Sequence, residues 1–317
     1  IRKFFSGPES FTPDTNTLLG EVPEIKNFFV CCGLNSIGIG SGGGVGKVTA
    51  EWMMTGHINE DIFSYDIKRF QKFHSELSFI KPRITETLGD LYGMHWPFKQ
   101  HKTSRNIKTL PYHDNLKSFG ACFGVSAGYE RPMWFALDGE KSEYEYSYNY
   151  QNWYPSAEYE TNNTIKNVGL FDLTPFSKFE IKSEKAHEEL QRICTANIKN
   201  EIGKCTYTHM LNSDGGIETD LTVVCIDKDH FRIISSAATR ERDKFHINKH
   251  LSKGIELKDV TDDYCVFGLF GPKSRDLIKS ISKDNFDNDN FKFGTAKNII
   301  IEGIKIWAQR LSYVGEL

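Results

Sequence analysis

The sequence predicts a mixed fold, the closing part of an α/β unit followed by an α+β domain. Length is the first reason, because 317 residues is about twice the size at which one hydrophobic core is usual. Composition is the second, since 39% apolar and 26% charged residues are typical of a globular chain. The third is a change of pattern: a strand–glycine–helix run near the start gives way, after residue 167, to hairpins that alternate with helices.

Composition also argues against several classes of function. The formal net charge is −3, from 39 Lys and Arg against 42 Asp and Glu, so no basic excess points to a nucleic-acid partner. No apolar run approaches the roughly 18 residues that a membrane-spanning helix requires. The seven cysteines form no Cys-x-x-Cys pair, which disfavours zinc binding and dithiol redox chemistry. We therefore expect no nucleic acid, no membrane span and no metal site.

Residues 1–60 have the pattern of the end of an α/β unit. The apolar run at 27–32 predicts a buried strand, 33–46 is a glycine-rich loop, and 47–54 predicts a helix that Gly56 stops. This arrangement brings backbone N–H groups and a helix N-terminus to an anionic ligand. The loop lacks the dinucleotide and phosphate-loop fingerprints. From these residues alone, cofactor contact and tight backbone packing both stay open.

Residues 61–154 are less regular, and we expect a segment there that links the first domain to the second. Residues 82–91 predict a helix, whereas 138–165 is a polar, tyrosine-rich stretch in which we place the domain boundary, at 154/155. Rows of aromatic side chains also occur in platforms that stack single-stranded nucleic acid. Acidic residues stand between these tyrosines, which favours a packed segment between domains.

Residues 155–317 have the clearest pattern. Alternation predicts a strand that ends at 182, and an amphipathic helix follows over 184–196. Strands at 205–212 and 217–226 flank the turn Ser213-Asp-Gly-Gly216, which predicts a hairpin. Strands are also predicted at 231–235, 265–270, around 299 and at 309–313, and helices at 240–251 and 273–281. Hairpins that alternate with helices predict an α+β domain.

Asp220 is the candidate catalytic residue that stands out. It lies in a β-branched, apolar strand just after the predicted hairpin turn. If Leu221 and Val223 face the core, then Asp220, Thr222 and Val224 face the other side of the sheet. From the residues alone, an exposed strand aspartate and a carboxylate that points into a cleft both stay open.

Several motifs resemble one family, the sarcosine and dimethylglycine dehydrogenases. The closing part of that family's FAD domain is similar to Ser6–Asp14, Cys32–Ser36 and Gly42–Gly46. Its linking segment resembles Tyr65–Phe70 and Gly128–Phe135. Its folate-binding aminomethyltransferase domain, shared with the glycine cleavage system, is similar to Phe171–Phe179, Met210–Asn212, Gly215–Val223, Phe270–Pro272 and Arg310–Leu317.

The resemblance implies a two-step reaction. A flavin oxidises an N-methyl group of sarcosine or dimethylglycine to an iminium, and tetrahydrofolate takes up the methylene unit. It implies that Asp220 assists proton transfer at folate. It also implies cofactor contacts, on the folate side by Tyr207, Thr222 and Tyr313, and on the FAD side by Asn35, Ser36, Gly42, Gly43 and Gly44.

The resemblance leaves two other functions open. One is a non-catalytic regulatory subunit of the pyruvate dehydrogenase phosphatase type, and the other is a free-standing aminomethyltransferase. The retained run Ser312–Glu316 favours the enzyme, and residues 1–137 disfavour the free-standing transferase. We expect the chain to be an internal piece of a longer protein, and inactive alone.

Partners and location follow from the same resemblance. The substrate is a small molecule, and either oxygen or an electron-transfer flavoprotein accepts the electrons. The implied location is the cytoplasm for a bacterial protein and the mitochondrial matrix for a eukaryotic one.

Overall fold

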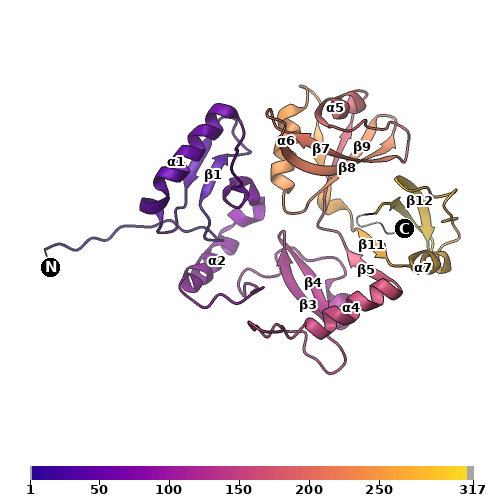
Figure 1. Ribbon diagram of the computed structural model, residues 1–317, viewed down its shortest axis with the longest axis horizontal. Coiled ribbons are helices and arrows are strands. Elements are labelled where there is room, and N and C mark those ends of the chain that lie inside the picture. The colour runs from indigo at the N-terminus through magenta and orange to yellow at the C-terminus, as the bar shows by residue number, and fades with distance from the viewer. Residues whose placement is uncertain (1, 313–317) are drawn as a thin grey trace. The chain divides into compact units, whose positions relative to one another are not determined.

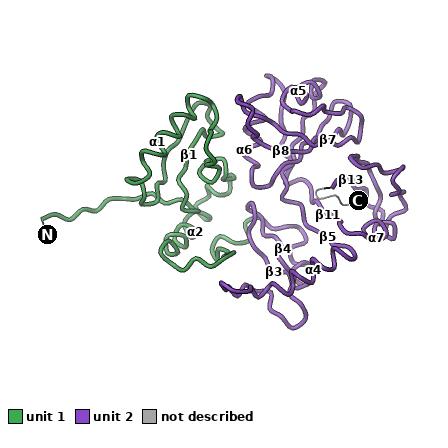
Figure 2. The backbone as a smooth tube through the Cα atoms, in the orientation of Figure 1, with its two compact units in different colours: residues 1–107 green, residues 108–317 purple. Residues whose placement is uncertain are grey.

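A computed structural model describes residues 2–312. The chain divides into two compact units, residues 1–107 and residues 108–317 (Figure 2). The division comes after residue 107, whereas Tyr154, beside the boundary that the sequence analysis placed at 154/155, begins a helix inside the second unit. None of the helices in the described range has the length and apolar character that a membrane crossing requires.

The first unit contains a small hairpin with one helix, α1 (Gly38–Thr55), against it (Figure 1). Strands β1 (Leu18–Glu21) and β2 (Phe29–Cys32) pair antiparallel. Helices α1 (Gly38–Thr55) and α2 (Leu77–Asp90) follow, with short 3-10 turns between them. Trp52 packs α1 onto the hairpin: a Cβ at Gly20 would lie 2.3 Å from its ring, and Gly20 has a φ of +106°. Only glycine fits there.

The expected glycine loop is wrong over most of its length. Helix α1 begins at Gly38, so Gly42, Gly43 and Gly44 lie in a helix rather than in a loop. Each glycine in a helix costs about 1 kcal/mol relative to alanine, which is why local propensity predicted a loop. Packing in the second half of α1, where Thr49 and Trp52 are buried, supports the helix instead. Its end at Gly56 is confirmed, with a left-handed φ of 81°.

Helix α2 also begins earlier than predicted, at Leu77, which leaves Pro82 inside it. Proline is common in the first turn of a helix, so the sequence placed the start at residue 82. The buried residues Phe79, Arg83 and Thr87 recur at every fourth position and form one face of the helix.

The second unit is built around a five-stranded antiparallel sheet (Figure 1). The strand order is β10-β6-β9-β8-β7, with β6 (Ser177–Lys182), β7 (Cys205–Leu211), β8 (Ile217–Asp227), β9 (His230–Ser235) and β10 (Leu257–Asp259). Three two-stranded sheets accompany it: β3 (Ala121–Ser126) with β4 (Tyr129–Phe135), β5 (Gly169–Asp172) with β11 (Phe267–Phe270), and β12 (Thr295–Ile301) with β13 (Ile304–Arg310). The helices are α3 (His113–Ser118), α4 (Tyr154–Lys166), α5 (Ala186–Ile193), α6 (Arg240–His250) and α7 (Ser274–Ile281).

The strands and helices predicted between residues 171 and 301 are confirmed, with small differences at their ends. The strand predicted at 309–313 is shifted, because β13 runs from Ile304 to Arg310 and residues 311 and 312 lie outside it; residue 313 lies outside the described residues. The turn between β7 and β8 closes as expected: Asn212 N–H donates to the carbonyl of Gly216 over 2.8 Å, and Gly215 has a φ of +83°. The pairing of β7 with β8 shifts at Met210/Leu211, where Glu218 is the extra residue of a bulge.

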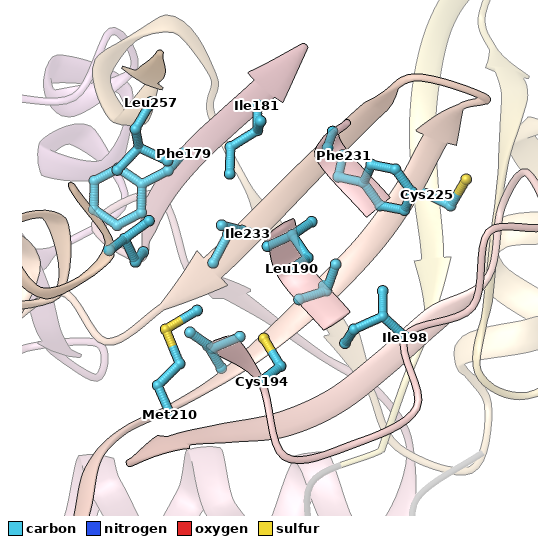
Figure 3. Close-up of a cluster of buried hydrophobic side chains, with 14 residues drawn as sticks. Phe179, Ile181, Leu190, Cys194, Ile198, Met210, Cys225, Phe231, Ile233 and Leu257 are labelled. Carbon is cyan, nitrogen blue, oxygen red and sulfur yellow. The ribbon is translucent and has the colours of Figure 1, made fainter. Parts of the chain in front are cut away.

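The core of this unit lies on one face of the five-stranded sheet (Figure 3). Alternate strand residues such as Phe179, Leu221 and Ile233 point into it, and Leu190 of α5 and Ile247 of α6 close it. Both helices therefore cover the same face, and the opposite face is exposed at its Asp220 end.

A hydrogen-bonded cluster joins the β3–β4 hairpin to α6 within the second unit. The Tyr129 hydroxyl donates to Asp262, which also pairs with Lys108 and with Arg240. Burial and the Asp262 carboxylate raise the pKa of Tyr129 above its ordinary range. These ionic contacts connect segments that are far apart in the sequence.

Candidate functional site

The candidate site lies on the sheet face that α5 and α6 leave open. Leu221 and Val223 are in the core, at 2% and 1% exposure, so Asp220 and Thr222 lie on the other face as the alternation predicted. Val224 belongs to that second face by alternation but is fully buried. The face is thus open at its Asp220 end and covered farther along β8.

Tyr207 and Asp220 form a hydrogen-bonded pair across β7 and β8. The Tyr207 hydroxyl donates to Oδ2 of Asp220 over 3.1 Å. In the register of these strands Tyr207 lies opposite Thr222, and His209 lies opposite Asp220. The pair is therefore a diagonal contact between neighbouring strands. The structure brings together Asp220, Tyr207 and Thr222, which the sequence analysis had selected separately.

His209, which is not among the predicted site residues, belongs to the same cluster. Its Nε2 lies 3.4 Å from the Tyr207 hydroxyl oxygen. The two rings meet edge to face, with centroids 5.2 Å apart. The signal was present, because residues 207 and 209 of one strand share a face, but the pairing with Asp220 needed the register.

An ion-pair cluster lies farther along the same face. The Arg232 guanidinium donates to Oε1 of Glu180 over 2.6 Å, and His230 Nε2 lies 3.0 Å from Oε2. Burial alone would raise the pKa of Glu180, but the hydrogen bonds from Arg232 and His230 outweigh it and the net shift is downward. The Arg232 guanidinium carbon lies over the Tyr264 ring, 4.2 Å from the ring centroid. The carboxylate of Glu180 is thus paired with a positive charge at this end of the sheet face.

The carboxyl with the strongly raised pKa in the described part of this unit is Asp243 rather than Asp220. Asp243 of α6 has 1% exposure and accepts a hydrogen bond from Thr239 over 2.7 Å. Burial raises its pKa to about 6. Its helix packs on the core face, so Asp243 and Asp220 lie on opposite sides of the sheet.

Two of the FAD-side candidates, Asn35 and Ser36, shape the turn before α1. Both have left-handed backbones, with φ of 48° and 64°. Asn35 is 4% exposed; its side-chain carbonyl accepts from Thr12 N–H over 2.9 Å, and its side-chain amide donates to the Gly33 carbonyl. Ser36 donates to the Glu9 carboxylate. Asn35 is therefore engaged inside the unit, where it fixes the turn.

The other FAD-side candidates leave an open surface on α1. A Cβ at Gly42, Gly43 or Gly44 would meet nothing within 4 Å, and none of the three has a left-handed φ. The fold itself therefore does not require glycine there. Bare helix backbone of this kind fits the close approach of a flat ligand such as a flavin.

The remaining folate-side candidate, Tyr313, lies outside the described residues.

His246 and His250 lie one turn apart on α6, with ring centroids 4.4 Å apart. This pair is not among the predicted site residues. Across residues 2–312, no group of three or more His, Cys, Asp or Glu side chains is arranged to hold a metal ion.

The domain arrangement defines the class to which this protein belongs. The closing part of an FAD-dependent oxidoreductase domain is followed by an aminomethyltransferase-like α+β domain. Residues 112–317 match the family model described as the GCVT N-terminal domain, and residues 55–109 match the FAD dependent oxidoreductase central domain. The chain belongs to the family that contains the sarcosine and dimethylglycine dehydrogenases.

Three relatives align with nearly the whole chain. A 4-methylaminobutanoate oxidase (formaldehyde-forming) of Paenarthrobacter nicotinovorans is 37% identical over 99% of the chain. The mouse pyruvate dehydrogenase phosphatase regulatory subunit is 31% identical and mouse sarcosine dehydrogenase 30% identical, each over 100% of it. The chain spans 38%, 37% and 39% of the lengths of these proteins.

A solved structure supports the fold. The glycine cleavage system aminomethyltransferase T from Bartonella henselae superposes with a TM-score of 0.51 at 20% identity, over 66% of this chain and 51% of that one. At this identity the similarity establishes the architecture alone.

Proposed function

We propose that this chain is part of an FAD- and tetrahydrofolate-dependent oxidative N-demethylase of methylated glycines, sarcosine or dimethylglycine. The observation that carries the proposal is the Tyr207–Asp220 pair on the open face of a GCVT-type sheet. The relatives support the oxidative half, because two of those described above are named as an oxidase or dehydrogenase of N-methylated amino acids.

Asp220 is assigned the proton transfer that accompanies closure of the methylene bridge on folate. A carboxylate accepts a proton and also stabilises the positive charge of an iminium. Tyr207 donates to Oδ2, so the second oxygen, Oδ1, is the one assigned to the folate nitrogen. Thr222 lies on the same face and offers a hydroxyl that can donate or accept.

The α1 region is assigned to the flavin. When bound, FAD supplies the hydride acceptor for oxidation of the N-methyl group. Gly42, Gly43 and Gly44 would let it approach the helix backbone. Asn35 would hold the preceding turn in place through its bonds to Thr12 and Gly33. The N-terminal end of α1 would favour negative charge nearby.

The test uses the protein in the full length that its gene encodes, loaded with FAD. Flavin reduction is followed by rapid mixing with sarcosine, dimethylglycine and 4-methylaminobutanoate in turn. Formaldehyde and 5,10-methylenetetrahydrofolate are then measured with and without tetrahydrofolate. We expect sarcosine or dimethylglycine to reduce the flavin, and tetrahydrofolate to divert the product from formaldehyde.

Three outcomes would contradict parts of this proposal. Reduction by 4-methylaminobutanoate alone would overturn the substrate class. Formaldehyde as the product whether or not tetrahydrofolate is present would overturn the folate step. No flavin reduction by any of the three amines would favour the non-catalytic regulatory function instead.

A further inference from the structure

We propose that His209 is a positioning residue of the folate site, which holds the Tyr207 hydroxyl against Asp220. The inference rests on the proposed function and assigns a role to a side chain outside the family motifs on which that function was based. It follows from the contact of three side chains on one sheet face: His209 meets Tyr207, and Tyr207 meets Asp220.

The number of available protons sets the direction of this chain of hydrogen bonds. An ionised carboxylate only accepts, so the single hydroxyl proton of Tyr207 is donated to Asp220. The Tyr207 oxygen is then left as an acceptor for His209, whose Nε2 lies 3.4 Å away. The contact therefore calls for a His209 ring that carries its proton on Nε2.

Tyr207 needs such support because the residue is 61% exposed. An exposed aromatic side chain samples several rotamers, and fixing it in one costs conformational entropy. The His209 ring meets the Tyr207 ring at 76°, edge to face. The ring contact and the hydrogen bond together restrict the phenol to the orientation that reaches Asp220.

The backbone of His209 is itself held in place. Strand β7 is an edge strand of the sheet. His209 N–H donates to Thr195 Oγ1 over 3.3 Å, and its carbonyl accepts from Thr195 N–H over 3.0 Å. The N–H and the carbonyl of His209 therefore point away from β8. His209 and Asp220 form a non-hydrogen-bonded pair of the antiparallel ladder, the type in which the two side chains lie closer together. The segment at 195 thus anchors the positioning residue from outside the sheet.

The experiment separates the hydrogen bond from the ring contact with two variants of the full-length, FAD-loaded protein. His209→Phe keeps a ring without a donor, and His209→Gln keeps a donor near the position of Nε2. We measure kcat and KM for tetrahydrofolate in the folate-coupled reaction, and the share of product captured by folate. His230→Phe, on the same face but bonded to Glu180, is the control.

We expect His209→Phe to lower folate-coupled kcat by about fivefold, the effect of one lost hydrogen bond, with little change in KM. His209→Gln should recover most of that loss, and His230→Phe should match the unaltered protein. Equal kcat in His209→Phe and the unaltered protein would overturn the inference, as would a loss that His209→Gln does not recover.

An independent measurement distinguishes failure of this inference from failure of the proposed function. In protein labelled with 15N-histidine, NMR reports which ring nitrogen carries the proton, and the His209→Phe spectrum assigns the signal. A neutral His209 ring protonated on Nδ1 would overturn the donor role whatever the enzyme assay gives. A ring protonated on Nε2 in a protein that never transfers the methylene unit to folate would overturn the function instead.

Discussion

At the residue scale, two aspartates on opposite sides of one sheet have different surroundings. Asp220 of β8 is exposed on the open face beside Tyr207, whereas Asp243 of α6 is buried on the core side. A perturbed pKa often marks a functional group, yet here it marks the carboxyl on the packed side. Position on the sheet, rather than perturbation, therefore identifies the candidate for chemistry.

Asp220→Ala should separate the two half-reactions. Loss of one positioned proton-transfer group costs on the order of 10²–10⁴ in rate, so methylene transfer to tetrahydrofolate should fall by that factor and formaldehyde should accumulate. Hydride removal from the amine should continue, because it is assigned to the other unit. Rapid-mixing flavin reduction and a formaldehyde assay measure the two steps. An equal loss in both steps would mean that Asp220 is structural.

Asp243 should make folding depend on pH in the acidic range. Its folded pKa, about 6, is above the ordinary 3.8, so the folded state binds the proton more tightly than the unfolded state. Stability is therefore highest below pH 3.8 for this group and falls as pH rises toward 6, by on the order of 3 kcal/mol.

Urea unfolding of the unaltered protein and of Asp243→Asn, from pH 4 to pH 7, tests this prediction. Asparagine does not titrate, so the free energy of unfolding of the unaltered protein should decline relative to the variant as pH rises. Parallel curves for the two proteins would show that Asp243 does not titrate differently on folding.

At the element scale, hairpins were the predictable part. The alternation around residues 205–226 and the turn at Ser213–Gly216 predicted β7 and β8, because a strand with one buried face has a period of two. The same alternation placed Asp220 and Thr222 on one face. The contact of His209 with Tyr207 and Asp220 was not predicted, because cross-strand neighbours depend on the strand register, and the register could not be deduced from the sequence.

Helix α1 was predicted only in its second half, and β4 and α4 were not predicted, for identifiable reasons. Helix α1 begins in a glycine run that local propensity disfavours. Strand β4 contains Pro132, which is unusual in a strand, and its pairing with β3 shifts at Cys122/Phe123. Helix α4 has Ser156 as its buried residue and a polar sequence, so its apolar periodicity is weak. In each case tertiary contacts decided what the local signal did not.

Helix α1 offers a test that sets stability against flavin binding. Gly43→Ala should raise the free energy of unfolding by up to about 1 kcal/mol, because alanine is the better helix former and its methyl group meets no protein atom. The same methyl group should weaken FAD binding if this surface faces the cofactor. Chemical denaturation and flavin titration of the full-length protein measure the two effects.

Gly89→Ala is the matched control, since Gly89 also lies in a helix with nothing within 4 Å of an added Cβ. It should stabilise the protein and leave flavin affinity unchanged. Unaltered flavin affinity in Gly43→Ala would remove α1 from the proposed cofactor surface.

At the scale of the whole molecule, the division after residue 107 nearly coincides with the meeting point of the two family models, at residues 109 and 112. Composition instead predicts a boundary in the tyrosine-rich segment, at 154/155. Composition shifts mark flexible linkers, but this segment leads into α4 and belongs to the second unit.

Tyr129→Phe should weaken the second unit by about 1.5–3 kcal/mol, because it removes a hydrogen bond to an ionised carboxylate. Tyr129 is buried, and Asp262 would keep Arg240 and Lys108 as partners. Urea unfolding, followed by tryptophan fluorescence, measures the change. A variant as stable as the unaltered protein would show that the cluster carries little of the energy that joins the β3–β4 hairpin to α6.

The bulge at Glu218 has a consequence for evolution. Glu218 is bonded to Arg242 of α6 over 2.7 Å, between the turn at 213–216 and the pair formed by His209 and Asp220. The composition of the turn is restricted, because Gly215 has a φ of +83° and a Cβ at Gly216 would lie 2.8 Å from Asn212. The count of residues between the bulge and the site is restricted as well, since one codon gained or lost there would exchange Asp220 for a neighbour that faces the core.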